Sequence, residues 1–326
     1  MIRGAAGPRA AGPRAWLVRL LGVALLLVTA DRVHRSTPRH VAERLRAGDV
    51  HVRAVRAGRG DTTVVLIHGY GESLLSFRSI FDRLAARYRV VALDLPGFGL
   101  SDKPEGPYDF PTMAWRLRDF LGRWTDGPVA VVGHSMGGQL AAALALAEPV
   151  RVVATVLIAP AGHGIAPLAQ RLAAPVREAL GWVDLVSGYL LPLHDAAWLR
   201  EPDDWADYSP GADPGYRRAA VAVLEQFDFA ALRDRYAELR QPTLIVWGRL
   251  DPTIPVAVGE RLASLVPCNR FVVLEHTLHR PHQALPDTVA AEVEAFIADP
   301  RSSAPACCPR CRGGAPRGAR GPASWR

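Results

Sequence analysis

The sequence predicts an α/β fold, in which a mostly parallel β-sheet is covered by helices on both faces and carries an inserted helical segment. Three observations indicate this fold: short, continuous apolar runs recur along the chain, amphipathic stretches of helical length separate most of them, and one long segment contains no such run. Strands buried on both faces of a parallel sheet have this continuous apolar pattern. Alternating strands and helices imply crossover connections, which place helices on both sides of the sheet.

The apolar runs are too short for helices and are rich in β-branched or aromatic residues, which favours strands. They cover residues 64–67, 90–93, 129–132, 152–158, 244–247 and 271–274. The helices that we expect around them cover residues 74–88, 112–124, 139–147, 258–266 and 287–298.

Residues 161–240 interrupt the alternation. This segment holds six prolines and three tryptophans among apolar, helix-like pieces, and it contains no strand-like run. Neither side of the segment has the composition of a linker. The sequence therefore predicts a helical cap inserted into a single domain.

Composition and charge restrict the class of protein. The chain has 326 residues, of which 49% are hydrophobic and 22% charged, so a wholly disordered, collagen-like or multi-span membrane chain is excluded. The net charge is +7, but residues 1–60 contribute +9 and residues 300–326 contribute +6, which leaves residues 61–299 at −8. Because a nucleic-acid enzyme is expected to carry its positive charge on the folded body, we expect no nucleic-acid partner.

Both ends of the chain are basic. Residues 1–49 form a predicted basic leader with an apolar segment at about residues 16–30, which resembles a secretory signal ending in small residues. No apolar run reaches the ~18 residues of a clean transmembrane helix, but Arg19 could snorkel to the interface and permit a signal anchor. We therefore expect an exported or membrane-anchored protein. The alternative is a cytoplasmic protein whose apolar segment lies on the folded body.

The C-terminal segment, residues 300–326, is rich in Pro, Gly, Arg and Ala and is predicted to be a disordered basic tail. Cys308 and Cys311 have CxxC spacing, but no second pair and no nearby histidine pair completes a zinc site. We expect no metal and no cofactor.

The apolar run 129–132 leads into Gly133-His134-Ser135-Met136-Gly137-Gly138 and then into a predicted helix. G-x-S-x-G between a strand and a helix is typical of a sharp turn that holds a nucleophilic serine clear of the backbone. Ser135 is therefore the predicted nucleophile. The Met136 amide, at the helix N-terminus, is a predicted donor to an oxyanion.

Residues with the chemistry needed to support a nucleophilic serine follow three further predicted strands. His68-Gly69-Tyr70-Gly71 follows the first apolar run, and its Tyr70 amide is the second predicted oxyanion donor. Asp251 follows the run 244–247, and His276 and His279 follow the run 271–274. The order serine, aspartate, histidine is the one expected of a hydrolase triad on a parallel sheet.

With these motifs the chain resembles the α/β-hydrolase superfamily, in its serine-nucleophile, esterase- or lipase-like branch. The matching stretches are residues 68–71, 94–104, 133–138, 247–252 and 279–287. The resemblance implies a hydrolase domain over residues 50–299 that includes the cap. It assigns the base to His279 rather than His276 and the acid to Asp251, since the motif around Asp94 makes a turn. One departure is Leu278, where the family usually has glycine.

The predicted activity is hydrolysis of a small or medium carboxylic ester with an apolar acyl part, through a Ser-His-Asp triad and an acyl-enzyme. Serine rather than aspartate at position 135 argues against epoxide and haloalkane hydrolysis. Carbon–carbon bond hydrolysis, cofactor-free peroxidation and lipase action on long chains stay open as alternatives. A non-catalytic binding module is a rival from another class. The oligomeric state is left open.

Overall fold

The computed structural model describes residue 40 and residues 42–162 and 213–301. The predicted signal or anchor segment at residues 16–30 lies outside the described residues. So do residues 163–212 of the predicted cap and most of the C-terminal tail.

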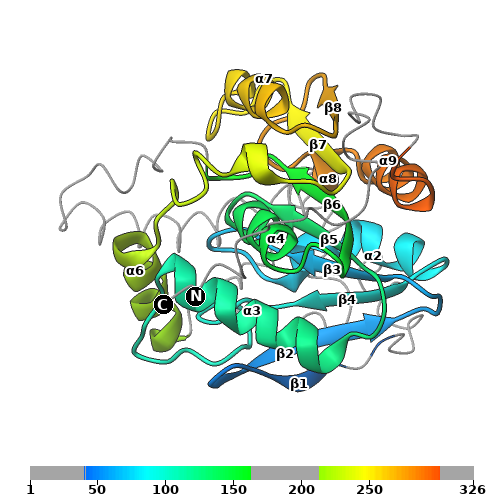
Figure 1. Ribbon diagram of the computed structural model, residues 1–326. Coiled ribbons are helices and arrows are strands. Elements are labelled where there is room, and N and C mark those ends of the chain that lie inside the picture. Colours follow the sequence, from blue (N-terminus) through cyan, green and yellow to red (C-terminus); the bar gives the residue numbers. More distant parts are fainter. Residues whose placement is uncertain (1–39, 41, 163–212, 302–326) are drawn as a thin grey trace, which may run out of the picture.

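An eight-stranded sheet forms the centre of the described structure, with the strand order β1-β2-β4-β3-β5-β6-β7-β8 (Figure 1). Strands β3 to β8 pair in parallel, whereas β1 and β2 are antiparallel to their neighbours. The prediction of a mostly parallel sheet is thus confirmed. The strands are β1 (Ala42–Ala47), β2 (Val50–Ala57), β3 (Thr63–Ile67), β4 (Arg89–Leu93), β5 (Val129–His134), β6 (Val152–Ile158), β7 (Thr243–Gly248) and β8 (Asn269–Leu274).

The hairpin of β1 and β2 was not among the predicted strands. In the edge strand β1 charged and apolar residues alternate, with Leu45 and Ala47 buried and Arg44 and Arg46 exposed, whereas β2 holds the buried Arg53 among apolar residues. An antiparallel edge with one solvated face has this alternation rather than a continuous apolar run. The sheet accordingly begins at Ala42, before the predicted start of the domain at residue 50.

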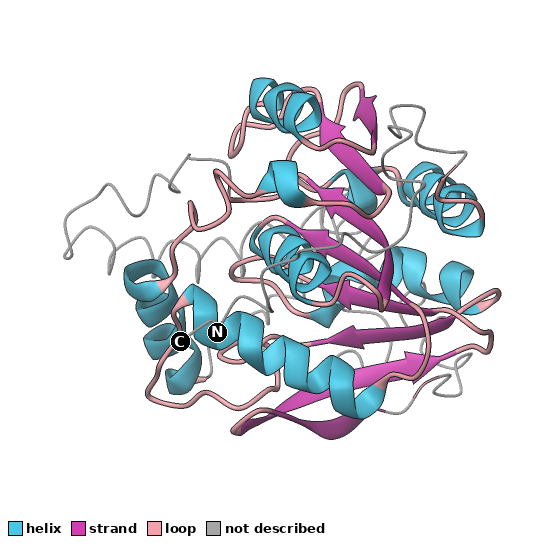
Figure 2. Ribbon diagram, viewed as in Figure 1, coloured by secondary structure: helices cyan, strands magenta, loops and turns pink. Residues whose placement is uncertain are grey.

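Helices cover both faces of the sheet (Figure 2). Helices α3, α4 and α7 contribute to the apolar cluster on one face, and α2 and α9 contribute to the cluster on the other. The helices are α2 (Arg78–Ala85), α3 (Phe110–Trp124), α4 (Met136–Ala147), α6 (Pro214–Gln226), α7 (Val256–Leu265), α8 (Pro281–Ala284) and α9 (Pro286–Ala298), with short 3-10 helices at Leu74–Phe77 and Tyr236–Glu238. None of the helices within the described residues is long and apolar enough to cross a membrane.

Strand β5 shows why the predicted strands are continuous apolar runs. Val129 and Val131 belong to the cluster beneath α3 and α4, whereas Ala130 and Val132 belong to the cluster beneath α2 and α9. Successive side chains of a strand point to opposite faces, so a sheet that is covered on both faces requires apolar residues at every position. This central strand ends at the predicted nucleophile.

The described part of the predicted cap includes α6, which lies against the loop after β3. Its Tyr216 hydroxyl donates a hydrogen bond to the Gly71 carbonyl (3.2 Å), and the Tyr70 hydroxyl donates one to the Ala220 carbonyl (3.2 Å). Asp213 caps the helix N-terminus by accepting from the Gly215 amide. These contacts fix α6 beside the turn that carries the predicted oxyanion donor Tyr70.

Candidate active site

Ser135 occupies a strained turn between β5 and α4. Its φ of 51° and ψ of −117° are unusual for a non-glycine residue. The turn is possible because its neighbours are glycines: a Cβ on Gly133 would lie 2.2 Å from the Gly137 carbonyl oxygen, and a Cβ on Gly137 would lie 2.2 Å from the Ile67 carbonyl oxygen. The Ser135 amide donates to the Ile158 carbonyl (2.9 Å), which ties the turn to β6.

The structure brings the three residues of the predicted triad together. His279 Nε2 lies 3.1 Å from Ser135 Oγ, and His279 Nδ1 lies 2.7 Å from Asp251 Oδ2. The other Asp251 oxygen accepts hydrogen bonds from the amides of Thr253 (2.8 Å) and Ile254 (2.9 Å). The buried carboxylate is thereby fixed by the turn after β7, with one oxygen facing the imidazole.

Burial lowers the pKa of His279 below its ordinary value of 6.5, and the hydrogen bond to Asp251 opposes that shift only in part. The imidazole is therefore neutral at pH 7. An ionised Asp251 can only accept, so the ring proton sits on Nδ1. The lone pair of Nε2 then faces the hydroxyl of Ser135, as a general base requires.

The two predicted oxyanion donors belong to segments next to Ser135. Met136 is the first residue of α4, where backbone N–H groups have no intrahelical acceptor. The loop after β3 packs directly on the serine, since a Cβ on Gly69 would lie 3.1 Å from Ser135 Cβ, and Tyr70 is the next residue. Both residues thus belong to segments that adjoin Ser135, and their role as oxyanion donors stays a prediction.

The two alternatives that the sequence offered occupy other surroundings. His276 is exposed to solvent in the loop after β8, with a φ of 59°. Asp94 is buried, and its two oxygens accept from Arg53 Nε and from the amides of Leu74 and Leu100, each at 2.7 Å. Neither side chain is part of the hydrogen-bonded row Ser135–His279–Asp251.

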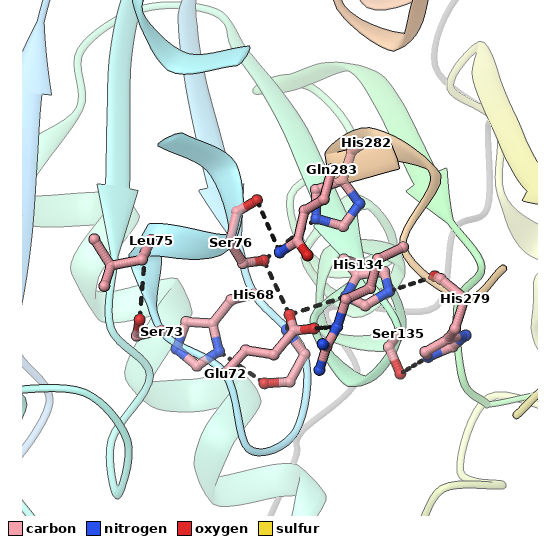
Figure 3. A network of polar contacts seen from close by, with 12 residues as sticks. His68, Glu72, Ser73, Leu75, Ser76, His134, Ser135, His279, His282 and Gln283 are labelled. Atoms are coloured by element: carbon pink, nitrogen blue, oxygen red, sulfur yellow. Dashed lines mark hydrogen bonds and ion pairs between the residues drawn. The ribbon is translucent and has the colours of Figure 1, made fainter. Parts of the chain in front are cut away.

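A buried carboxylate that the sequence did not single out, Glu72, lies next to His134 (Figure 3). Glu72 Oε2 lies 3.0 Å from His134 Nδ1 and accepts from the Gly69 amide (2.9 Å), and Glu72 Oε1 accepts from Arg280 Nε (2.7 Å). Burial alone would raise the pKa of Glu72, but the charges of His134 and Arg280 hold it well below 4.5. In the printed sequence Glu72 is an isolated acid in a loop, and no local pattern indicates that it is buried.

His68 and His134 both have backbone partners. His68 Nε2 accepts from the Leu95 amide (2.8 Å), which joins the turn after β3 to the turn after β4. His134 Nε2 lies 2.9 Å from the His279 carbonyl oxygen. In residues 42–162 and 213–301, no group of three or more His, Cys, Asp or Glu side chains could hold a metal ion.

The fold and the site define the class: the chain belongs to the alpha/beta hydrolase fold family, which matches residues 62–282. It is 30% identical over 260 residues to a pimeloyl-[acyl-carrier protein] methyl ester esterase of Aeromonas salmonicida (strain A449), covering 76% of this chain and 99% of the relative. It is 28% identical over 288 residues to a 2-hydroxy-6-oxo-6-(2'-aminophenyl)hexa-2,4-dienoic acid hydrolase of Metapseudomonas resinovorans, covering 83% of this chain and 96% of that enzyme. A solved membrane phospholipase A matches with a TM-score of 0.61 and 26% identity, covering 88% of this chain and 98% of that structure. The protein is thus an α/β hydrolase.

Proposed function

We propose that this α/β hydrolase cleaves carboxylic esters through a covalent acyl-enzyme on Ser135. The observation that carries the proposal is the continuous hydrogen-bonded row from Ser135 Oγ through His279 to Asp251, with distances of 3.1 and 2.7 Å. A nucleophile within reach of a base that a third group orients is the arrangement that activates a serine.

In the proposed reaction, His279 Nε2 takes the Ser135 proton as Oγ attacks the ester carbonyl carbon. The amides of Tyr70 and Met136 donate hydrogen bonds to the oxyanion that forms. Collapse of the tetrahedral intermediate breaks the carbon–oxygen bond, and His279 returns its proton to the departing alcohol. Water, activated by the same base, then releases the acid, while Asp251 keeps Nδ1 protonated and stabilises the imidazolium.

The proposed substrates are small to medium esters with an apolar acyl part. The composition of the predicted cap, which is rich in tryptophan and leucine, supports an apolar substrate. The esterase of Aeromonas salmonicida supports ester chemistry in a relative that aligns over nearly its whole length. Both lines of support concern the substrate and are independent of the geometry around Ser135.

Carbon–carbon bond hydrolysis is a second candidate, favoured by the similarity to the dienoic acid hydrolase of Metapseudomonas resinovorans. The same serine and histidine would serve that reaction. A parallel assay on a p-nitrophenyl ester series and on a 2-hydroxy-6-oxo-dienoic acid separates the candidates. A higher kcat/KM on the dienoic acid would replace the ester proposal.

Membrane association through residues 16–30 stays a proposal from the sequence. The similarity to a solved membrane phospholipase A is consistent with such a location. Fractionation of cells that express the full chain tests it: the proposal expects the protein in the membrane or exported fraction, and recovery only from the cytoplasmic fraction would refute it.

Replacing the nucleophile tests the ester proposal itself. Ser135→Ala should lower kcat on an activated ester by a factor on the order of 10⁶ and abolish labelling by a fluorophosphonate, because the acyl-enzyme cannot form. Ser264→Ala is the matched control, since this exposed hydroxyl only contacts the Arg261 carbonyl. Near-wild-type turnover by a folded Ser135→Ala protein would exclude the proposed mechanism.

A further inference from the structure

The two ring nitrogens of His134 both face atoms that can only accept hydrogen bonds. Nδ1 lies 3.0 Å from Glu72 Oε2, and Nε2 lies 2.9 Å from the backbone carbonyl oxygen of His279 (Figure 3). A neutral imidazole has one N–H group and one bare lone pair, so it can satisfy only one of these contacts. The geometry at His134 therefore requires both nitrogens to carry protons.

Glu72 cannot donate a hydrogen bond to His134. Its carboxylate oxygens already accept from the Gly69 amide (2.9 Å), the Ser76 hydroxyl (3.0 Å) and Arg280 Nε (2.7 Å). The Arg280 guanidinium is a permanent positive charge, and together with His134 it keeps the pKa of Glu72 low despite burial. The carboxylate is thus ionised and can only accept, so the His134 Nδ1 that lies 3.0 Å from it must carry a proton.

The neighbouring His282 shows the opposite protonation. Ser76 Oγ donates its only proton to Glu72, so it must accept from His282 Nε2 at 3.3 Å. The buried His282 Nδ1 has no hydrogen-bond partner, which fits a bare lone pair better than an N–H group. Burial and the nearby charge of His134 both lower the pKa of His282. Its ring centroid lies 4.7 Å from that of His134, so a neutral ring packs against the charged one.

We propose that His134 is held as an imidazolium by Glu72, and that this buried ion pair positions the catalytic histidine and the oxyanion loop; the positioning role rests on the proposed function. One partner of the pair is the His279 carbonyl, and another is the Gly69 amide, next to Tyr70. His134 also directly precedes Ser135. Glu72 and His134 touch no reacting atom, so both are positioning residues.

A His134 ring with a single N–H group would leave either Glu72 or the His279 carbonyl without its donor. The ionisable groups that face His134 are Glu72 from the loop after β3, and His279 and His282 from the segment after β8; Arg280 faces it across Glu72, and His68 adds a more distant interaction.

Replacing the counterion tests the charge. In Glu72→Gln a neutral amide replaces the carboxylate that pairs with the imidazolium. Nitrogen-15 NMR of this variant at pH 7 should show a bare ring nitrogen on His134, and a role for Glu72 in packing alone would leave both ring nitrogens protonated.

Nitrogen-15 NMR of the full chain labelled at histidine tests the protonation state directly. At pH 7 the proposal expects both ring nitrogens of His134 to have the chemical shifts of protonated nitrogen, with the resonances assigned by their absence in His134→Gln. A bare ring nitrogen on His134 would overturn the proposal. His276→Asn, which removes an exposed imidazole outside the site, should leave these resonances in place. The measurement needs no substrate, so it is independent of the proposed ester hydrolysis.

Two substitutions separate the contacts of His134. Gln places its amide nitrogen near the position of Nε2 and can still donate to the His279 carbonyl, whereas Asn places it near Nδ1 and can donate only to Glu72. If the His279 contact positions the base, kcat should fall by about 10²-fold in His134→Asn, as for a base displaced by about 1 Å, and by clearly less in His134→Gln. Melting curves establish that both variants fold.

Equal losses in the two folded variants, or losses confined to KM, would refute positioning through the His279 carbonyl. The rate of fluorophosphonate labelling gives the same comparison for any reaction that uses Ser135. A chain that labels with the expected order of rates but hydrolyses no ester would therefore contradict the proposed substrate and support the positioning role.

Discussion

The turns that follow β4 and β7 each carry a buried aspartate beyond the carboxyl end of a parallel strand, yet their surroundings differ. Asp94, after β4, is bonded by Arg53 and by two backbone amides, and it lies at the centre of its turn. One oxygen of Asp251, after β7, accepts from two backbone amides, and the other faces His279 Nδ1.

The difference lies in what the partner can do. The guanidinium of Arg53 stays protonated, so its ion pair with Asp94 can only fix the turn after β4 to strand β2. The imidazole of His279 can gain and lose a proton, so its bond to Asp251 can change state during a reaction. The same strand-end position thus serves structure in one turn and chemistry in the other.

Replacing the acid of the second turn should have the largest effect. Asp251→Asn keeps the shape of the side chain but allows the His279 ring to take the tautomer with its proton on Nε2. A loss on the order of 10⁴-fold in kcat on an activated ester is the precedent for that change in a serine triad. Melting curves should show a folded protein, and full activity of the variant would remove Asp251 from the site.

The same substitution in the first turn should affect stability rather than catalysis. Asp94→Asn leaves the buried Arg53 guanidinium without its counterion, which typically costs about 3–5 kcal/mol. Urea unfolding should reveal this loss in the free energy of unfolding. The kcat of the folded protein should stay within a few-fold of wild type. A folded Asp94→Asn protein without activity would show that Asp94 is the acid and would reverse the comparison.

The pH dependence provides a finer contrast between the two turns. Burial places the pKa of His279 below 6.5. The acid limb of the kcat/KM profile should therefore be centred below pH 6.5, because acid protonates the base there. Asp251 opposes this shift, so its loss in Asp251→Asn should move the acid decline to still lower pH. Asp94→Asn should leave the decline where it is. A wild-type decline centred above pH 6.5 would contradict the protonation state derived for His279.

The sequence was informative where one local pattern determines the structure. Continuous apolar runs predicted the six parallel strands, and the glycines around Ser135 predicted the turn, since a Cβ at Gly133 or Gly137 would collide with backbone. The resemblance to the α/β hydrolases assigned the acid to Asp251 and the base to His279. The hairpin β1–β2 was not predicted because charged residues interrupt its apolar positions, so it lacks a continuous apolar run.

The network behind the site could not be predicted in the same way. Glu72 and Arg280 are far apart in the chain, and their contact at 2.7 Å follows only from the packing of the loop after β3 against the segment after β8. An isolated glutamate in a loop is normally solvated, so sequence alone favours exposure. Its burial becomes evident only when its four donors are assembled around it: the Gly69 amide, the Ser76 hydroxyl, His134 and Arg280.

The smallest expected effect concerns the second histidine of the loop after β8. His276 is exposed and has a φ of 59°, a conformation that Asn tolerates well. His276→Asn therefore removes the imidazole without new backbone strain, and it should change kcat/KM by less than about twofold and the free energy of unfolding by less than about 0.5 kcal/mol.

His279→Ala is the matched comparison and should be as inactive as Asp251→Asn. The variant that combines His279→Ala with Asp251→Asn should be little worse than either, because the two groups act as a unit. Leu278 bears on this test, since its exposed side chain and its φ outside the left-handed region show that the loop does not require the glycine usual in the family. An inactive His276→Asn beside an active His279→Ala would show that the loop rearranges and that the base is the earlier histidine.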